Sequence, residues 1–374
     1  MHNVAAGKGD LPHGSGPEKA ARIIAFYLPQ FHPTPENDLW WGKGFTEWTN
    51  VASAKALFKG HEQPRVPADL GFYDLRLPET RVAQAEMAAH FGIEGFCYWH
   101  YWFGGRRMLE RPFNEVLSSG QPDFPFCLGW ANHSWNGIWK DEPHRLLIDQ
   151  TYPGEDDDRA HFDYLLKAFE DKRYIRVDGK PMLVIFKPTD VPEAKRRFDF
   201  WRELALKAGL PGLHIVGINM LDFDSAAELG LDAVTMSTLA VTNTSNAVVN
   251  EVSRIAWGIR RRLSLGGPRV VEYREAIKHL VPDLNQLDRE AYPCVFPNWD
   301  NTPRKGRKGL VLANSTPQLF EQHLRDAVKA VAGREEEHRI VFLKSWNEWA
   351  EGNYLEPDTK WGLQYLEALK RVVG

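Results

Sequence analysis

The strongest constraint on the fold of this chain is a repeated alternation of short apolar runs with segments of helical periodicity. Apolar or β-branched runs occupy eight segments: 22–31, 94–102, 124–131, 181–187, 213–220, 232–237, 291–297 and 339–345. Helical spacing of apolar residues marks five others: 79–91, 159–171, 193–208, 316–332 and 363–373. Strands that alternate with helices form parallel sheets. Eight such strands predict a single (β/α)8 TIM barrel.

An open, doubly wound parallel sheet is the competing architecture. It would favour a glycine-rich dinucleotide or phosphate loop after an early strand, and the sequence has neither. With 374 residues, of which 43% are hydrophobic, the chain is long enough to bury one large core. We therefore expect one catalytic domain over residues 21–374, preceded by a flexible segment at 1–20.

Two segments are longer than ordinary barrel loops. Residues 33–78 follow the first predicted strand and include Trp48, and residues 238–269 follow the sixth. Long loops in a compact domain are usually lids or binding loops, and loops that follow barrel strands surround the active face. The sequence thus predicts a substrate cleft bordered by these two loops.

Charge and cysteine content limit the partners and the compartment. The formal net charge is −4 and no basic cluster is present, so nucleic-acid binding is not expected. No run of about 18 apolar residues predicts a membrane span. Three separated cysteines within apolar runs, and no signal-peptide core in the first 20 residues, favour a reducing, cytoplasmic location. The sequence does not indicate an oligomeric state.

Glu348 and Glu351 are the candidate catalytic pair. They lie three residues apart, directly after the last predicted strand, with Trp349 between them. Cleavage of an acetal requires an acid together with a base or nucleophile, and barrel glycosidases place such carboxylates at the carboxyl ends of strands. The pair therefore predicts glycoside chemistry.

Other aromatic and polar residues follow the predicted strands and should share the mouth of the barrel. Trp and Tyr can stack on sugar faces, while Asn and His can hydrogen-bond sugar hydroxyls. The expected substrate is therefore a carbohydrate. The candidate binding residues at strand ends and beside the carboxylates are Tyr27, His32, Trp99, His100, Trp102, Trp130, Asn132, His133, Trp135, Asn298, Trp299, Trp349 and Tyr354, with Trp48 from the first long loop.

His32, His100 and His133 follow three successive strands and raise the alternative of a metal site. They occur singly, without the His-x-His or His-Glu-x-x-His spacing of zinc enzymes. We therefore predict no metal and no cofactor, and assign these histidines to hydrogen bonding. Glu356 and Asp358, in a turn with Pro357, are expected to be solvated or to cap the loop.

Several motifs resemble those of a known family. They are Tyr27-Leu-Pro-Gln-Phe-His-Pro33, Gly44-Phe-Thr-Glu-Trp-Thr-Asn50, Gly95-Phe-Cys-Tyr-Trp-His-Tyr-Trp102, Trp130-Ala-Asn-His-Ser-Trp135 and Ser345-Trp-Asn-Glu-Trp-Ala-Glu-Gly352. Together they resemble the WbsX-type proteins of bacterial polysaccharide gene clusters, often labelled glycosyltransferases and related to glycoside hydrolase family 99. The resemblance covers residues 22–372.

The resemblance implies a metal-independent barrel that acts inside α-mannose-containing glycans with retention. It implies that Glu348 takes the proton of the sugar 2-hydroxyl, so that O2 forms a 1,2-anhydro intermediate. Glu351 would be the acid for the leaving group and then the base for water. Glu47 matches a substrate-binding Glu of the family. Ala350 replaces the family's His between the two carboxylates.

Three hypotheses follow. The first is a retaining, endo-acting glycoside hydrolase on a polysaccharide or oligosaccharide, such as a bacterial surface polysaccharide. The second is a glycosyltransferase of polysaccharide biosynthesis, although the sequence has no phosphate-binding loop. The third is a carbohydrate-binding protein that keeps the aromatic cleft without catalysis.

Overall fold

The computed structural model describes residues 19–137, 142–218, 225–235, 266–281 and 290–374, and its centre is a parallel β-barrel. Neighbouring strands pair in the order β12, β10, β9, β8, β4, β2, β1, β16, β13. Their bounds are β1 (Arg22–Tyr27), β2 (Gly95–Phe103), β4 (Phe126–Trp130), β8 (Lys180–Ile185), β9 (His214–Ile218), β10 (Ala233–Thr235), β12 (Glu290–Tyr292), β13 (Cys294–Val295) and β16 (Ile340–Leu343). The predicted (β/α)8 barrel is confirmed.

The barrel closes through its seventh strand, which Pro293 divides into β12 and β13. β12 pairs with β10, whereas β13 pairs with β16 on the other side. Proline has no backbone N–H to give to a ladder, and its carbonyl accepts from the N–H of Phe342 at 2.9 Å. The two ends of the strand order are therefore consecutive in the chain, and the nine paired segments form eight strands.

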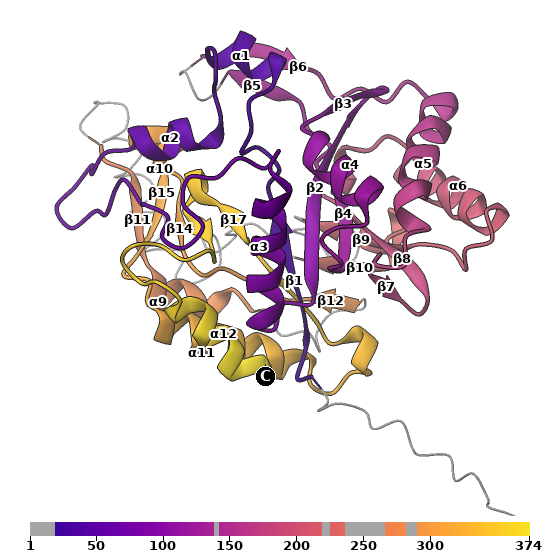
Figure 1. Ribbon diagram of the computed structural model, residues 1–374. Coiled ribbons are helices and arrows are strands. Elements are labelled where there is room, and N and C mark those ends of the chain that lie inside the picture. Colours follow the sequence, from indigo (N-terminus) through magenta and orange to yellow (C-terminus); the bar gives the residue numbers. More distant parts are fainter. Residues whose placement is uncertain (1–18, 138–141, 219–224, 236–265, 282–289) are drawn as a thin grey trace, which may run out of the picture.

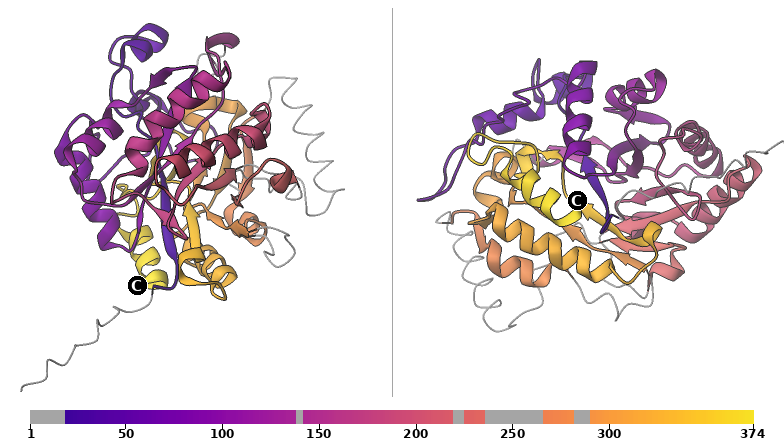
Figure 2. Two further views of the ribbon diagram at one scale, coloured as in Figure 1. Left: turned by 90° about the vertical axis from the view of Figure 1, so that its right-hand side faces the viewer. Right: turned by 60° about the horizontal axis from the view of Figure 1, so that its bottom comes forward.

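Helices cover the outside of this barrel in every view (Figures 1 and 2). The predicted helices are all present, and α4 is an addition that the sequence reading did not assign. The long helices are α3 (Pro78–His90), α4 (Arg111–Ser119), α5 (Glu155–Phe169), α6 (Ala194–Lys207), α11 (Pro317–Val331) and α12 (Gln364–Val373), and the single-turn helices include α7 (Ser225–Glu228) and α9 (Tyr273–Ala276).

Helix α11 shows why these segments are helical. The Thr316 side chain caps its first turn by accepting from the N–H of Leu319, and Pro317 occupies the first helical position, where its missing N–H costs nothing. Phe320, Leu324, Ala327 and Val331 then recur at helical spacing and are buried against the barrel. Burial of this stripe against the strands is what fixes the helix in place.

The first long loop folds into two short helices at one end of the barrel. These are α1 (Pro35–Trp41) and α2 (Glu47–Ser53), and the hairpin of β5 (Trp135–Gly137) and β6 (Glu142–Ile148) lies at the same end (Figure 1). A separate three-stranded sheet consists of β11 (Arg269–Glu272), β15 (Leu310–Ala313) and β14 (Trp299–Asp300). The short helix α10 (Thr302–Lys305) follows β14 in the chain. The second predicted long loop, 238–269, lies almost entirely outside the described residues.

Strand alternation separates the interior of the barrel from its helix-facing side. Phe26, Trp99 and Phe342 point inward and stack, with ring centres 4.8 Å apart for the first pair and 5.3 Å for Phe26 and Phe342. The next residues along each strand point outward to the helices. Cys97 and Cys127 lie opposite each other on β2 and β4, and all three cysteines are buried and free.

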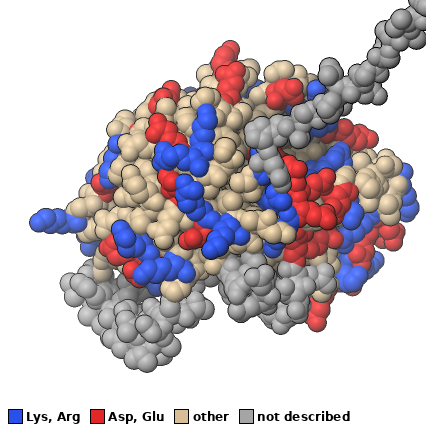
Figure 3. All heavy atoms as spheres, turned by 90° about the horizontal axis from the view of Figure 1, so that it is seen from below, with Lys and Arg blue, Asp and Glu red and all other residues tan. Residues whose placement is uncertain are grey.

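The surface carries charges of both signs. Seen from the side opposite α1 and α2, Lys and Arg lie among Asp and Glu with uncharged surface between them (Figure 3). No helix in the described part of the chain is long and apolar enough to cross a membrane.

Candidate active site

A cavity of about 310 Å³ opens at the carboxyl ends of the barrel strands. Its walls combine aromatic rings with charged groups, and both candidate catalytic carboxylates reach it. The residues that line it are Leu28, Gln30, Trp41, Trp99, Tyr101, Ala131, His133, Ser134, Trp135, Asn136, Leu147, Phe186, Arg304, Lys305, Lys344, Glu348 and Glu351. A larger hollow, of about 500 Å³, lies beside β11 and β15 and contains neither carboxylate.

A short hairpin places the two carboxylates. β17 (Asn347–Glu348) pairs antiparallel with β18 (Asn353–Tyr354), and a 3-10 turn, Trp349–Glu351, joins them. Asn347 fastens the hairpin to the end of β1, since its amide accepts from the N–H of Leu28 at 2.7 Å and donates to the carbonyl of the same residue at 3.0 Å. Both carboxyl groups are thereby held over the barrel.

Gly352 ends the 3-10 turn in a left-handed conformation, with φ +57°. A Cβ there would lie 2.6 Å from the backbone nitrogen of Asp300. The glycine of the Ala-Glu-Gly sequence is therefore required for steric reasons, because only glycine lets the hairpin approach β14 this closely.

Trp99, on the inward face of β2, orients the Glu348 carboxyl. Its indole N–H donates to Glu348 Oε1 at 3.0 Å, and the ring lies across Gly129 of the neighbouring strand, where a Cβ would be 3.2 Å from the ring. Glycine on β4 thus makes room for the tryptophan on β2, and the tryptophan orients the carboxyl.

Arg304 holds Glu351 from the side. Its guanidinium contacts Glu351 Oε1 at 2.7 Å and Glu47 Oε2 at 3.0 Å. Glu47 is fully buried at the start of α2. It does not line the cavity, but it shares the arginine with a carboxylate that does. Asn353 donates to the other oxygen of Glu351 at 3.2 Å.

The surroundings of the two carboxyls shift their pKa values in opposite directions. Burial raises the pKa of Glu348 to about 7, and the neighbouring Glu351 charge adds to the rise. Burial would also raise the pKa of Glu351, but the cations of Arg304 and Lys344 outweigh it and lower that pKa to about 2. The proximity of the two carboxyl groups reinforces each of these pKa shifts. Below about pH 7 the pair therefore holds one proton, on Glu348.

Of the residues predicted from the sequence, five line the cavity: Trp99, His133, Trp135, Glu348 and Glu351. His133 lies against Phe186, with ring centres 5.2 Å apart, and burial lowers its pKa to about 4, so the imidazole is neutral at pH 7. Trp135 makes edge contacts with Trp40 and Tyr101. The rings of Phe186, Trp135 and Tyr101 form part of the aromatic wall of the cavity.

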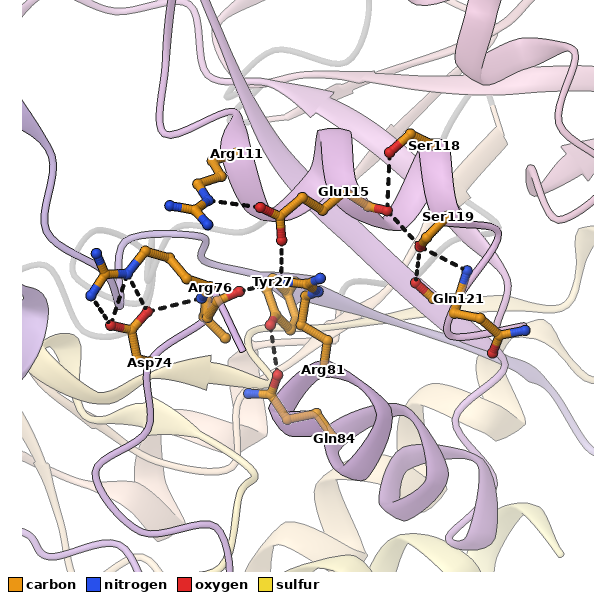
Figure 4. Close-up of polar contacts among 11 residues, drawn as sticks. Tyr27, Asp74, Arg76, Arg81, Gln84, Arg111, Glu115, Ser118, Ser119 and Gln121 are labelled. Atoms are coloured by element: carbon orange, nitrogen blue, oxygen red, sulfur yellow. Dashed lines mark hydrogen bonds and ion pairs between the residues drawn. The ribbon is translucent and has the colours of Figure 1, made fainter. Parts of the chain in front are cut away.

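Four predicted residues point from the strands toward the helices. Tyr27 donates to Gln84 of α3 at 2.6 Å, beside Arg81 (Figure 4). His100 shares a hydrogen bond of 2.8 Å with His161 of α5. Trp102 donates to Asp157 of the same helix, and Trp130 packs on Trp201 of α6. These side chains attach helices to the barrel and do not line the cavity.

The other predicted residues are held within the loops. Asn132 bonds both the N–H and the carbonyl of Lys187, and Asn298 bonds the backbone of Tyr354. Trp48 donates to the carbonyl of Tyr73. Three more are buried or packed outside the cavity lining: His32 near Asp74, Trp349 stacked on Tyr354 at 3.7 Å, and Trp299 beside Phe296.

Glu356 differs from its expected role. The carboxyl is only 2% exposed and accepts from Tyr73, Gln84 and Trp349, the last at 2.6 Å. Burial raises its pKa to about 7. The prediction of a solvated side chain was wrong, because three donors on separate segments enclose it. Asp358 does cap the following turn, accepting from the N–H groups of Lys360 and Trp361.

The main residues that sequence reasoning missed are cations. Arg304, Lys305 and Lys344 line the cavity, and Tyr101 and Phe186 complete its aromatic wall. Lys344, Tyr101 and Phe186 are inward-facing by strand alternation, a signal the sequence contained. Arg304 comes from α10, which no periodicity revealed. Within the described part of the chain, no three of His, Cys, Asp or Glu gather as a metal-ligand group.

The fold and site define a barrel protein of the carbohydrate-active kind. The structure is similar to a glycoside hydrolase-like protein, at 17% identity over 98% of this chain and 97% of that one, with a TM-score of 0.59. It is also similar to the glycoside hydrolase family 99 endo-α-mannosidase of Bacteroides thetaiotaomicron, at 14% identity over 94% and 95%, with a TM-score of 0.56. At such identities the likeness concerns the fold.

The chain belongs to the family described as glycosyltransferase WbsX, whose model matches residues 23–369. It is 37% identical over 362 residues to the uncharacterized protein WxcX of Xanthomonas campestris pv. campestris, in two strains. The alignment covers 94% of this chain and 50% of WxcX. The chain thus spans about half the length of the curated relatives it matches.

Proposed function

We propose that this chain is a retaining glycoside hydrolase that cleaves within an α-mannoside-like polysaccharide or oligosaccharide. The observation that carries the proposal is the Glu348 and Glu351 pair, with one pKa raised and the other lowered, in a cavity walled by tryptophan and tyrosine. Two carboxyls whose environments separate their pKa values are suited to acid and base roles. The family 99 fold supports the choice of glycan and of internal cleavage.

A carboxyl pair that shares one proton suits a mechanism in which the sugar's own 2-hydroxyl is the nucleophile. As the bond breaks, Glu348 takes the proton of O2, O2 attacks the anomeric carbon, and Glu351 gives a proton to the departing oxygen. In the second half, Glu351 takes a proton from water, water opens the 1,2-anhydro ring, and Glu348 returns its proton to O2. One carboxyl is protonated and the other ionised at every stage.

The resting site starts from the opposite arrangement, with the proton on Glu348 and with Glu351 ionised beside Arg304. The first half therefore requires the proton to pass from Glu348 to Glu351. A substrate hydroxyl that displaces Arg304 from Glu351 would favour this transfer. The contact between Arg304 and Glu351 thus determines the fraction of molecules in which Glu351 carries the proton and can react.

The test is a screen of the purified protein against α-mannans and bacterial O-polysaccharides, with products sized by mass spectrometry and the anomer followed by NMR. Glu351→Gln should lower turnover by about 100-fold or more while glycan binding persists. Glu86→Gln, an exposed change on α3, is the matched control. Unchanged hydrolysis in Glu351→Gln would falsify the assignment.

The family description favours a second candidate, a glycosyltransferase. The same pair could pass the sugar to a hydroxyl of an acceptor glycan in place of water. Incubation with nucleotide sugars and acceptor oligosaccharides separates the two: longer products, with no hydrolysis of glycans alone, would establish transfer.

A further inference from the structure

Lys344 is a cation that the proposed chemistry leaves without a direct role. It follows β16 and points into the cavity, by the same alternation that turns Phe342 inward. The residue is 7% exposed. Its ammonium lies over two indole rings, 5.9 Å from the centre of Trp99 and 5.7 Å from that of Trp299.

Within the described residues, the Lys344 ammonium makes no ion pair and no hydrogen bond. A lysine buried to this degree is almost always paired, because removing an ammonium from water is costly. Contacts with ring faces offset part of that cost. The charges of Glu348 and Glu351 reach it through space, but their own contacts are with Trp99 and Arg304. An anion within the cavity would complete the coordination of the ammonium.

The charges around the cavity also favour an anionic ligand. Arg304 is shared by the two carboxylates Glu47 and Glu351, while Lys305 and Lys344 line the cavity without an equivalent anion. While the catalytic pair holds one proton, these three cations face two negative charges. The cavity therefore has a surplus positive charge beside its reacting groups, which attracts a negatively charged ligand.

We propose that the substrate is an acidic glycan, in which a carboxylate or phosphate on the sugar bound in the cavity contacts Lys344. This inference rests on the proposed glycoside function and narrows its substrate class. Trp99 and Trp135 would contact the apolar parts of the sugar, and Lys344 would select its charge. A neutral glycan would leave the ammonium buried and unpaired, which is how a site discriminates against the uncharged analogue.

The experiment measures binding, so that it does not depend on cleavage. Titration calorimetry compares α-linked oligogalacturonate with its carboxyl-reduced form, and phosphorylated mannan oligosaccharides with their dephosphorylated forms. Wild type should bind one anionic member more tightly than its neutral counterpart, on the order of 10- to 100-fold. The carboxylate and phosphate arms identify which anion the site takes.

Variants separate substrate recognition from a purely electrostatic role of Lys344 on the carboxyl pair. Lys344→Met should remove the preference for the anionic member and leave the affinity for the neutral one unchanged, while Lys344→Arg should keep it. Lys329→Met, on the exposed face of α11, changes net charge equally and should have no effect. A role limited to tuning the pair would instead shift the pH profile and weaken both ligands alike.

The proposal is overturned if no anionic member binds better than its neutral counterpart, or if Lys344→Met weakens both equally. Cleavage of neutral mannan in that case leaves the hydrolase assignment intact. Lys344-dependent binding of an acidic glycan without cleavage does the reverse, since it supports the acidic ligand and removes the hydrolase. Lys344-dependent binding of nucleotide sugars alone would overturn both in favour of transfer.

Discussion

The two faces of strand β2 carry similar residues with different roles. Trp99 and Tyr101 face the cavity, where the first supports Glu348. His100 and Trp102, of equally suitable chemistry for sugar binding, face α5 and bond its side chains. The difference is one position in a pattern of period two. Residue type alone does not identify a binding residue at a strand end; its parity along the strand has to be read as well.

The largest effect is expected for Arg304→Met, on the cavity side. The change leaves the buried Glu47 without its cation, and removing one partner of a buried ion pair costs about 3–5 kcal/mol. Urea unfolding should show this loss. Adding Glu47→Gln should recover much of it, because the uncompensated charge is then gone. A single variant as stable as wild type would show that this cluster does not support the fold.

The next effect separates the two faces directly. Trp99→Phe removes the N–H donor to Glu348, and a hydrogen bond to a charged group contributes about 1.5–3 kcal/mol, so kcat should fall about 10- to 100-fold. Trp102→Phe should leave kcat unchanged and lower stability by about 1 kcal/mol, since it loses only its bond to Asp157. Equal losses of kcat in both variants would contradict the comparison.

The cavity side should also determine the pH dependence of activity. The pair keeps its one proton until pH rises through about 7, where Glu348 ionises. Above that pH, kcat should fall about tenfold per pH unit. Glu348→Gln cannot lose a proton and should abolish this limb along with most activity. A profile that stays flat to pH 9 would contradict the raised pKa.

The helix-facing side should instead determine stability in acid. Burial lowers the pKa of His100 to about 3 and that of His161 well below its usual value. The unfolded chain then binds protons below about pH 6.5 that the folded chain does not, so stability falls as pH falls from there. The slope contributed is up to about 1.4 kcal/mol per unit for each group. Replacing both histidines with Phe should flatten the slope between pH 6 and 4.

The barrel could be read from the sequence because its strands are continuous apolar runs, buried on both faces. The break at Pro293 could not, since a change of ladder partner leaves no mark on hydrophobicity. Helices α1 and α2 were missed because each is only seven residues long and is set by caps, such as Thr46, rather than by an apolar stripe.

The site was only partly readable. Glu348 and Glu351 were identified by their place after the last strand, and their location in one cavity agrees with that reading. The aromatic residues were chosen by type, so those of the wrong parity, such as Trp130, were included. Arg304 gave no signal, because cations at loop positions are common on any surface and only tertiary contacts mark this one as buried. Lys344 was marked by its parity with Phe342 and was overlooked because residues were chosen by type.

The hydrogen bonds between Asn347 and Leu28 join residues 319 positions apart, and Arg304 meets Glu47 across 257. The first of these contacts cannot form until Asn347 has left the ribosome. The hairpin that carries both carboxylates therefore docks on a residue made 319 positions earlier in the chain. Before that point in synthesis, a nascent chain can pair its earlier strands and still have no carboxylate pair over the barrel, so cleavage by this pair would begin only after Glu351 has been made.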